Sequence, residues 1–221
     1  MLPDMQEDSV DMPEADEPEA IHVPDHGEAM RIAEALLFAA SAPLSVEELT
    51  GRLPEGADVE KILQDLSELY ALRGVNLVRV AGKWTFRTAS DLSFVLARDV
   101  VEQRRLSRAA METLAIIAYH QPVTRAEIEE IRGVATSKGT VDLLLETGWV
   151  RLRGRRKAPG RPVTYGTTSG FLEHFGLDAI EDLPGLEELK GAGFLEGRVP
   201  SDFSVPTPSD ADALREDEDP L

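Results

Sequence analysis

The sequence contains no cysteine, and this absence excludes several kinds of chemistry. Disulfide bonds, thiolate nucleophiles and cysteine-based zinc sites all need a thiol group, and a chain without thiols fits a reducing compartment. None of the four histidines has a plausible set of partners that would complete a catalytic or metal site. His22 and His26 have a spacing that could hold a metal ion, but they lie in a proline-flanked acidic stretch. We therefore expect a non-enzymatic protein that needs no cofactor.

The sequence also lacks long apolar runs. No window approaches the ~18 consecutive apolar residues that a membrane-spanning helix needs. The start of the chain has neither the basic region nor the apolar stretch of a secretory signal. We therefore expect a cytoplasmic protein that makes no contact with a membrane.

Lysine and arginine are almost absent from both ends of the chain. Residues 1–27 carry nine acidic residues and no lysine or arginine, and residues 201–221 carry seven acidic residues and one arginine. The two ends hold 15 of the 18 excess negative charges, so residues 28–200 have a net charge of only −3. Segments rich in proline and acids but poor in large apolar residues cannot bury enough surface to fold. We predict disordered acidic tails at residues 1–27 and 197–221, and the total charge does not argue against contact with nucleic acid.

Between these ends, the hydrophobic pattern predicts three helices followed by a β-hairpin. Residues 28–40 form a helix that is apolar on nearly every side. Ser45 and Glu48 have the spacing of a capping box, which starts a short second helix. Residues 58–70 then have apolar side chains at helical spacing, and residues 78–86 alternate between apolar and polar around a tight Ala-Gly turn. This order of elements is typical of a winged-helix domain.

The same pattern recurs in the second half of the chain. An apolar helix that starts at Ser107 precedes a second capping box, formed by Thr124 and Glu127. A third helix follows at residues 137–147, and residues 149–168 contain the two strands of a second hairpin. The sequence therefore predicts an α+β, mostly helical chain with two tandem winged-helix domains.

The expected domain boundaries follow from this repeat. The first winged-helix domain, with a linker helix, spans residues 28–104, and the second spans residues 105–168. A helical extension follows at residues 169–196. Its apolar residues would either pack back on the second domain or form a docking strip for a partner helix.

The second hairpin contains a strongly basic segment with no acidic residue. Its cations are sufficient for several contacts with phosphate groups. They are Arg151, Arg153, Arg155, Arg156, Lys157 and Arg161. The third helix of the first domain, however, carries four acidic residues against Lys61 alone, a charge pattern that would repel a DNA backbone. A DNA-binding architectural or regulatory protein that uses the basic wing at residues 151–161 is therefore the alternative function, and weak or indirect DNA contact stays open.

The motif LSRAAMETLAIIAYHQPVTR at residues 106–125 closely resembles the segregation and condensation protein B family. The resemblance covers roughly residues 28–190, and ALLF at residues 35–38 resembles the family's more variable amino-terminal half. Further matching motifs are GV at 133–134, GRP at 160–162, YGTT at 165–168, FL at 171–172 and FGL at 175–177. One departure is visible at residues 135–137, where Ala-Thr-Ser replaces a polar Asn-Ser-type helix start. The cap of the third helix is therefore expected at Thr136 or Ser137.

The resemblance implies a non-catalytic, homodimeric accessory subunit of the bacterial SMC complex, associated with the nucleoid. It implies that the first domain mediates dimerisation. The partner of the second domain would be the kleisin subunit, segregation and condensation protein A, which bridges the SMC ATPase heads. Such a subunit would support chromosome condensation and segregation during cell division.

The first helix supplies the candidate residues for the dimer contact. A helix that is apolar nearly all round must be covered on more than one side, either by its own domain or by a second copy of the protein. Ile32, Leu36 and Leu37 are therefore candidates for the dimer contact, and an ordinary core is the other interpretation of the same residues.

Overall fold

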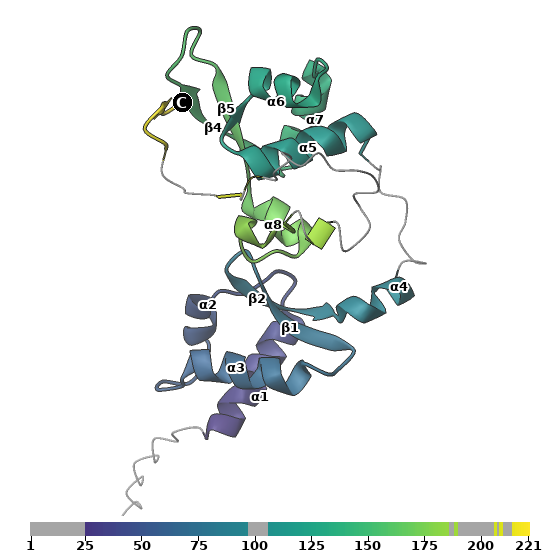
Figure 1. The fold of residues 1–221 in the computed structure, drawn as a ribbon. Helices are drawn as coiled ribbons and strands as arrows, with labels where there is room; N and C mark the ends of the chain where they lie inside the picture. The colour runs from purple at the N-terminus through teal and green to yellow at the C-terminus, as the bar shows by residue number, and fades with distance from the viewer. Residues whose placement is uncertain (1–24, 97–105, 186–187, 190–205, 207, 210–213) are drawn as a thin grey trace, which may run out of the picture.

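The computed structural model describes residues 25–96, 106–185, 188–189, 206, 208–209 and 214–221. Its helices and two small antiparallel sheets make an α+β fold (Figure 1). Two clusters of buried apolar side chains share no residue. They divide the described elements into an amino-terminal half, residues 25–96, and a carboxyl-terminal half, residues 106–185.

The amino-terminal half has three helices followed by a hairpin. Their bounds are α1 His26–Ala39, α2 Val46–Thr50, α3 Val59–Tyr70, β1 Val75–Val80 and β2 Lys83–Thr88. Ser45 and Glu48 form the expected capping box at the start of α2, and the carboxylate of Asp58 caps α3. Ala81 and Gly82 have φ angles of 51° and 76°, the left-handed geometry that a two-residue hairpin turn needs.

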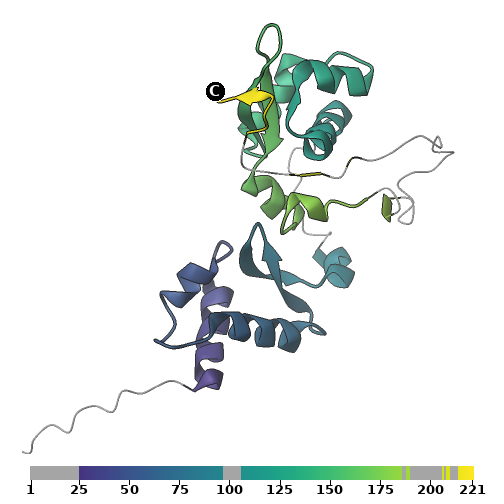
Figure 2. The same cartoon turned by 60° about the vertical axis from the view of Figure 1, so that its left-hand side comes forward.

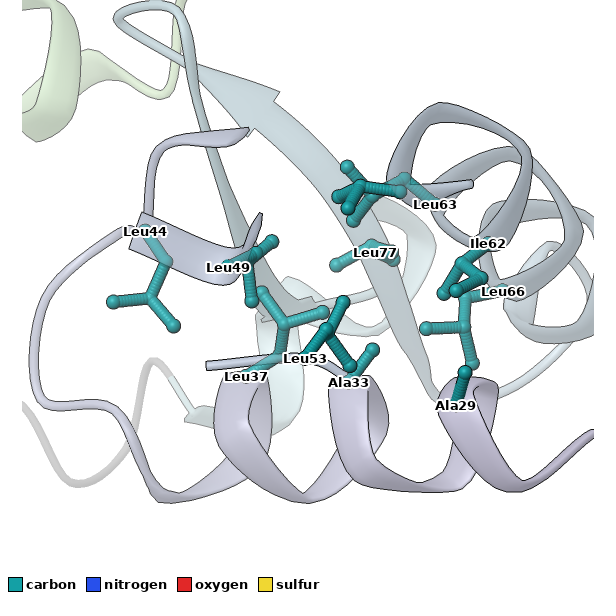
Figure 3. Close-up of a cluster of buried hydrophobic side chains, with 11 residues drawn as sticks. Ala29, Ala33, Leu37, Leu44, Leu49, Leu53, Ile62, Leu63, Leu66 and Leu77 are labelled. Carbon is teal, nitrogen blue, oxygen red and sulfur yellow. The ribbon is translucent and has the colours of Figure 1, made fainter. Parts of the chain in front are cut away.

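α1 packs on α3 through one side only. Ala29, Ala33 and Leu37 recur every fourth residue and are at most 3% exposed. Figure 3 shows all three side chains directed into the core, with Ala29 nearest to Ile62 and Leu66 of α3. The other buried members of this core are Leu44, Leu49, Leu53, Val59, Leu63 and Leu77. Because positions four residues apart share one helix face, α1 has a distinct inner and outer side although its sequence is apolar nearly all round.

The carboxyl-terminal half repeats this order around a larger sheet. Its bounds are α5 Arg108–His120, β3 Val123–Thr124, α6 Arg125–Arg132, α7 Lys138–Glu146, β4 Val150–Arg156 and β5 Val163–Thr167. Thr124 and Glu127 form the second capping box, as expected. Ser137 caps α7, one of the two positions expected from the local departure in sequence. Gly133 ends α6 with a φ of 69°, a conformation that glycine adopts without steric cost.

The chain after β5 packs back on the carboxyl-terminal half. It contains α8, Ser169–Phe175, and the short 3-10 helix η2, Ile180–Asp182. Phe171 and Ile180 are buried in the core of this half, with Leu172, Leu177 and Leu183 packed around them. Of the two arrangements that the sequence allows for these residues, the structure has the one in which they cover the second half. The predicted extension also includes residues 186–187 and 190–196, which lie outside the described part of the chain.

The predicted linker helix is described only at its start. The 3-10 helix η1, Ser90–Leu92, and α4, Ser93–Leu96, follow β2. Residues 97–104 of the predicted linker lie outside the described residues.

Residues 214–221, which we call the C-terminal segment, extend the second sheet. The strand β6, Glu218–Asp219, pairs antiparallel with β4, and the sheet order is β3-β5-β4-β6. Figures 1 and 2 show this segment, in yellow, beside β4. The composition predicts disorder for all of residues 197–221, and the structure differs from that expectation here. The reason is that β4 provides an open strand edge with cations beside it, which the composition of the tail does not reveal.

The amino-terminal tail also differs slightly from the expectation. α1 starts at His26, inside the predicted tail, and His26 Nε2 lies 2.7 Å from the Asp65 carboxylate on α3. Residues 1–24 of that tail lie outside the described residues, as do residues 197–205, 207 and 210–213 of the other.

Candidate interaction surfaces

The three candidate dimer residues lie on different sides of α1. Leu37 is 3% exposed and belongs to the core. Ile32 and Leu36 are half-buried and pack against the edge of that core. Phe38, by contrast, is 84% exposed, and Ala35 is exposed as well. We call Ile32, Ala35, Leu36 and Phe38 the outer face of α1, the side on which a partner can bind.

Two open grooves border the outer face of α1. One has a volume of about 420 Å³ and extends from Phe38 to the aromatic rings of Tyr70 and Phe86, whose centres are 4.7 Å apart. The other has a volume of about 410 Å³ and is lined by Ile32, Ala35 and Leu36 together with the charged Glu28 and Arg31. Apolar grooves beside an exposed helix are suited to receive the apolar face of another helix.

Tyr70 is held in place in the wall of the first groove. Its hydroxyl donates a hydrogen bond to the Glu34 carboxylate of α1. This hydrogen bond, partial burial and the negative charge of Glu34 raise the pKa of Tyr70. The guanidinium of Arg73 lies 4.8 Å from the centre of the Tyr70 ring, within reach of a cation–π contact. The wall between α1 and α3 is therefore formed before any partner binds.

The basic wing is the β4–β5 hairpin, and all six predicted cations lie on it with defined contacts. Arg151 Nε donates to the Thr167 carbonyl at 2.9 Å, and Arg155 Nη1 donates to the Arg161 carbonyl at 3.3 Å. The other cations meet acids of the C-terminal segment. These ion pairs are Arg153–Glu218 at 3.8 Å, Arg156–Asp217 at 2.7 Å, Lys157–Asp219 at 3.8 Å and Arg161–Asp219 at 2.8 Å. The wing is therefore a network of ion pairs, and not an open cluster of cations.

Glu127 connects the start of α6 to the base of the wing. Its carboxylate accepts hydrogen bonds from the Thr124 N–H at 2.7 Å and from Arg156 Nη2 at 3.0 Å. Burial acts to raise the pKa of Glu127, but these two partners outweigh it, and the pKa is lowered. For Arg156, burial acts to lower the pKa, but Glu127 and Asp217 outweigh it and the pKa is raised. Both groups therefore stay charged at neutral pH.

The β1–β2 turn contacts the chain just after α8. The Ala81 N–H donates to the Leu177 carbonyl at 2.9 Å, and the Gly82 N–H donates to Asp178 Oδ1 at 2.8 Å. Asp178 also pairs with Arg79 at 3.5 Å. Because Leu177 packs against the core of the carboxyl-terminal half, the turn of one half is held by a segment anchored in the other.

The carboxyl-terminal half exposes a second apolar area on α5 and α6. Met111 of α5 and Ile131 of α6 are both exposed, and so is Val134 just after α6. Glu112 and Arg132, their neighbours in sequence, form an ion pair at 3.4 Å between the two helices. Exposed apolar side chains beside an ion pair are suited to an amphipathic partner.

The described residues offer little for other kinds of site. None of the described helices has the length and hydropathy needed to cross a membrane. Within the same residues, no group of three or more histidine, cysteine or acidic side chains is arranged to hold a metal ion. His120 is half-buried, and this burial lowers its pKa.

Comparison with known proteins places the chain among its relatives. The family model described as the segregation and condensation complex subunit ScpB matches residues 31–186. The segregation and condensation protein B of Moorella thermoacetica is 47% identical over 160 residues, which cover 71% of this chain and 82% of that protein. A segregation and condensation protein B homolog of Coxiella burnetii is 41% identical over 165 residues, which cover 72% of this chain and 78% of that protein.

Solved structures include a relative from the same family. The crystal structure of ScpB from Mycobacterium tuberculosis is 31% identical, with a TM-score of 0.32, and the match covers 70% of this chain and 98% of that chain. On the sequence matches, the chain belongs to the segregation and condensation protein B family, whose members are non-catalytic subunits of the complex that segregates and condenses chromosomes.

Proposed function

We propose that the protein is a homodimeric subunit of the SMC–kleisin complex that binds the kleisin, segregation and condensation protein A. Through the kleisin it would act with the SMC ATPase at the nucleoid, in the cytoplasm, to support chromosome condensation and segregation during cell division. Family membership supports this role. The observation that carries the dimer is the 84% exposure of Phe38 on the outer face of α1.

The order of elements supports two tandem winged-helix domains. In each half, three helices precede an antiparallel hairpin, and the second and third helices start at a side-chain cap. The first domain would dimerise and the second would bind the kleisin, with boundaries near those expected from the sequence.

The outer face of α1 is our candidate for the dimer contact. Related by a two-fold axis, two copies would place the same surface on both sides of the interface. Removing one Phe38 side chain from water contributes about 1.5–3 kcal/mol, and a symmetric dimer buries two of them. Ile32 and Leu36 border the same face, while Leu37 supports it from the core.

The kleisin contact is assigned to the second apolar area, Met111, Ile131 and Val134. A kleisin segment that folds as an amphipathic helix could bury these side chains while its polar side faces the Glu112–Arg132 pair. This surface lies on the half that does not contain α1, so one chain can hold both partners at once.

Light scattering after gel filtration tests both contacts with matched variants. The intact chain should be a dimer and should form a larger complex with the kleisin. The double substitution Ala35→Asp, Phe38→Asp should raise the dimer dissociation constant by at least ~100-fold, because the apolar contact it removes contributes about 3 kcal/mol to the binding free energy. The substitutions Met111→Asp and Ile131→Asp should keep the dimer and lose the kleisin.

The control for the dimer is Leu143→Asp, which places an aspartate on an exposed apolar residue of α7. This variant should stay dimeric. If the Ala35→Asp, Phe38→Asp protein is folded and remains a dimer, the outer face of α1 is not part of the dimer interface. An intact chain that is monomeric and does not bind the kleisin would overturn the proposed function.

A further inference from the structure

The C-terminal segment is bound to the basic wing as a peptide strand is bound to a sheet edge. Arg155 lies opposite Asp219 and Arg156 opposite Glu218 in the β4–β6 ladder, and the Lys157 N–H donates to the Asp217 carbonyl at 2.8 Å. The segment lies outside residues 31–186, the part that the family model matches. Its contact with the wing is therefore a feature of this chain beyond the shared part of the family.

A buried pocket receives the Glu218 carboxylate. The Glu218 side chain is 0% exposed, and the Arg153 side chain that faces it is 3% exposed. Thr164 donates its hydroxyl to Glu218 Oε1 at 2.6 Å, and the Arg215 N–H donates to Oε2 at 3.1 Å. A buried charge is strongly unfavourable without such partners. The pocket is therefore built for an acidic side chain at this position.

Gly154 in β4 provides the space for the segment. A Cβ atom at this position would lie 2.7 Å from the Asp219 carbonyl oxygen and 2.9 Å from the Leu214 side chain. Outside the segment, the nearest atom is the Thr164 hydroxyl oxygen at 3.7 Å, an ordinary contact distance. A side chain at residue 154 would therefore exclude the segment while the rest of the sheet accommodates it.

The segment supplies acidic partners to three further cations of the wing, of which Arg156 is also paired with Glu127. Asp217 pairs with Arg156, and Asp219 pairs with Lys157 and Arg161. The Lys157 ammonium also donates to the Glu216 carbonyl at 2.7 Å. These cations lie at the end of β4 and in the loop that follows, where a long anionic partner can reach them.

We propose that the basic wing binds the phosphate backbone of double-stranded DNA, and that the C-terminal segment is an intramolecular competitor that occupies the wing when DNA is absent. Carboxylates and phosphates seek the same cations, so the two ligands exclude each other. DNA is the polyanion that we expect this protein to meet, because the complex of its family segregates and condenses chromosomes. This proposal does not depend on the dimer or on the kleisin contact.

The test measures binding of a fluorescent DNA duplex of about 30 base pairs to the full chain by anisotropy at several salt concentrations. The intact chain should bind weakly. Gly154→Ala should displace the segment and tighten binding at low salt by at least about tenfold. Because Lys157 and Arg161 lose their acidic partners while Arg156 keeps Glu127, the slope of log affinity against log salt should steepen by about 2. The matched control is Gly139→Ala in α7, where a Cβ meets nothing within 4 Å and binding should not change.

A second variant removes the acidic partners of the same cations without changing any buried side chain. Asp217→Asn, Asp219→Asn leaves Glu218 in its pocket and should also tighten DNA binding. Its control, Glu60→Gln, Glu146→Gln, changes the total charge by the same amount on exposed helix positions and should have little effect. Adding Lys157→Ala and Arg161→Ala to Gly154→Ala should cancel the increase in DNA affinity that Gly154→Ala causes.

A competition experiment separates DNA from an acidic protein partner. The synthetic peptide LREDEDPL, residues 214–221, should displace DNA from the Asp217→Asn, Asp219→Asn chain, which keeps the space at Gly154 that this sequence needs. If this chain binds the peptide and not DNA, the surface is an acidic-peptide site and the DNA proposal is overturned. If neither the Gly154→Ala chain nor the Asp217→Asn, Asp219→Asn chain binds DNA more tightly than the intact protein, the proposal is overturned as well.

Discussion

Replacing Glu127 by alanine should destabilise the carboxyl-terminal half by about 2 kcal/mol. One part of this loss is the capping box, because a missing helix cap costs about 1 kcal/mol. The other part is the ion pair with Arg156, whose side chain is 15% exposed while that of Glu127 is 42% exposed. Since solvent partly screens the Glu127 carboxylate, this pair is worth about 1 kcal/mol, the upper end of the range for exposed pairs.

The two tryptophans allow each half to be followed separately. Trp84 lies in β2 of the amino-terminal half, and Trp149 immediately precedes β4 of the carboxyl-terminal half. In a Trp84→Phe background, urea unfolding monitored by fluorescence reports the carboxyl-terminal half alone. For a small unit, the dependence on urea is about 1–2 kcal/mol per molar, so Glu127→Ala should lower the midpoint by about 1–2 M.

The control is Glu48→Ala, which removes the equivalent residue of the first capping box. In a Trp149→Phe background it should lower the midpoint reported by Trp84, and in the Trp84→Phe background it should leave the Trp149 midpoint unchanged. A Glu127→Ala effect below about 0.3 kcal/mol, the usual uncertainty of additive comparisons, would refute the assignment of Glu127 as the link between α6 and the wing.

Three further predictions concern stability. Leu66→Ala should cost about 2–5 kcal/mol and shift the Trp84 unfolding signal but not the Trp149 signal, because Leu66 is fully buried in the first core. Gly133→Ala should cost about 1 kcal/mol in the Trp149 signal, because it places a Cβ at a φ of 69°, and an unchanged midpoint would contradict this. Acid should weaken the carboxyl-terminal half, because Glu127 has a lowered folded-state pKa and the unfolded chain therefore takes up its proton first. This stabilisation is complete above the ordinary carboxyl value of 4.5 and is lost as the pH falls through the lowered pKa, so a urea midpoint that stays constant on acidification would count against it.

Local signals in the sequence were sufficient to predict most helices and turns. The capping boxes at Ser45 and Thr124 predicted where α2 and α6 start, since both partners of each box lie within four residues of each other. The Ala81-Gly82 turn was predicted for the same reason. Short-range hydrogen bonds of this kind depend on little beyond neighbouring residues.

The orientation of α1 could not be predicted with the same certainty. Nearly every position of this helix is apolar, so its composition does not show which side faces the core. The sequence analysis named Ile32, Leu36 and Leu37 as candidates, and the structure buries Leu37 while it exposes Phe38. The four-residue spacing of Ala29, Ala33 and Leu37 contains the signal, but only the position of α3 shows that this spacing marks the inner side.

The C-terminal segment was missed for a different reason. Its acidic residues predict disorder when the segment is considered alone. The partners that order it are the Glu218 pocket and the cations of the wing, which lie more than fifty residues earlier in the chain. Pairing between segments so far apart leaves no periodic pattern in either of them. The dimer, kleisin and DNA contacts remain predictions.

The contact between the β1–β2 turn and the chain after α8 makes the two halves mechanically dependent on each other. Leu177 fills part of the second core with its side chain and holds Ala81 with its carbonyl oxygen. A rotation of one half relative to the other would either break the hydrogen bonds that Leu177 and Asp178 accept from the turn or displace α8 from the core of the carboxyl-terminal half. A force applied to the outer face of α1 would therefore reach the carboxyl-terminal half through the contact of Ala81 and Gly82 with Leu177 and Asp178.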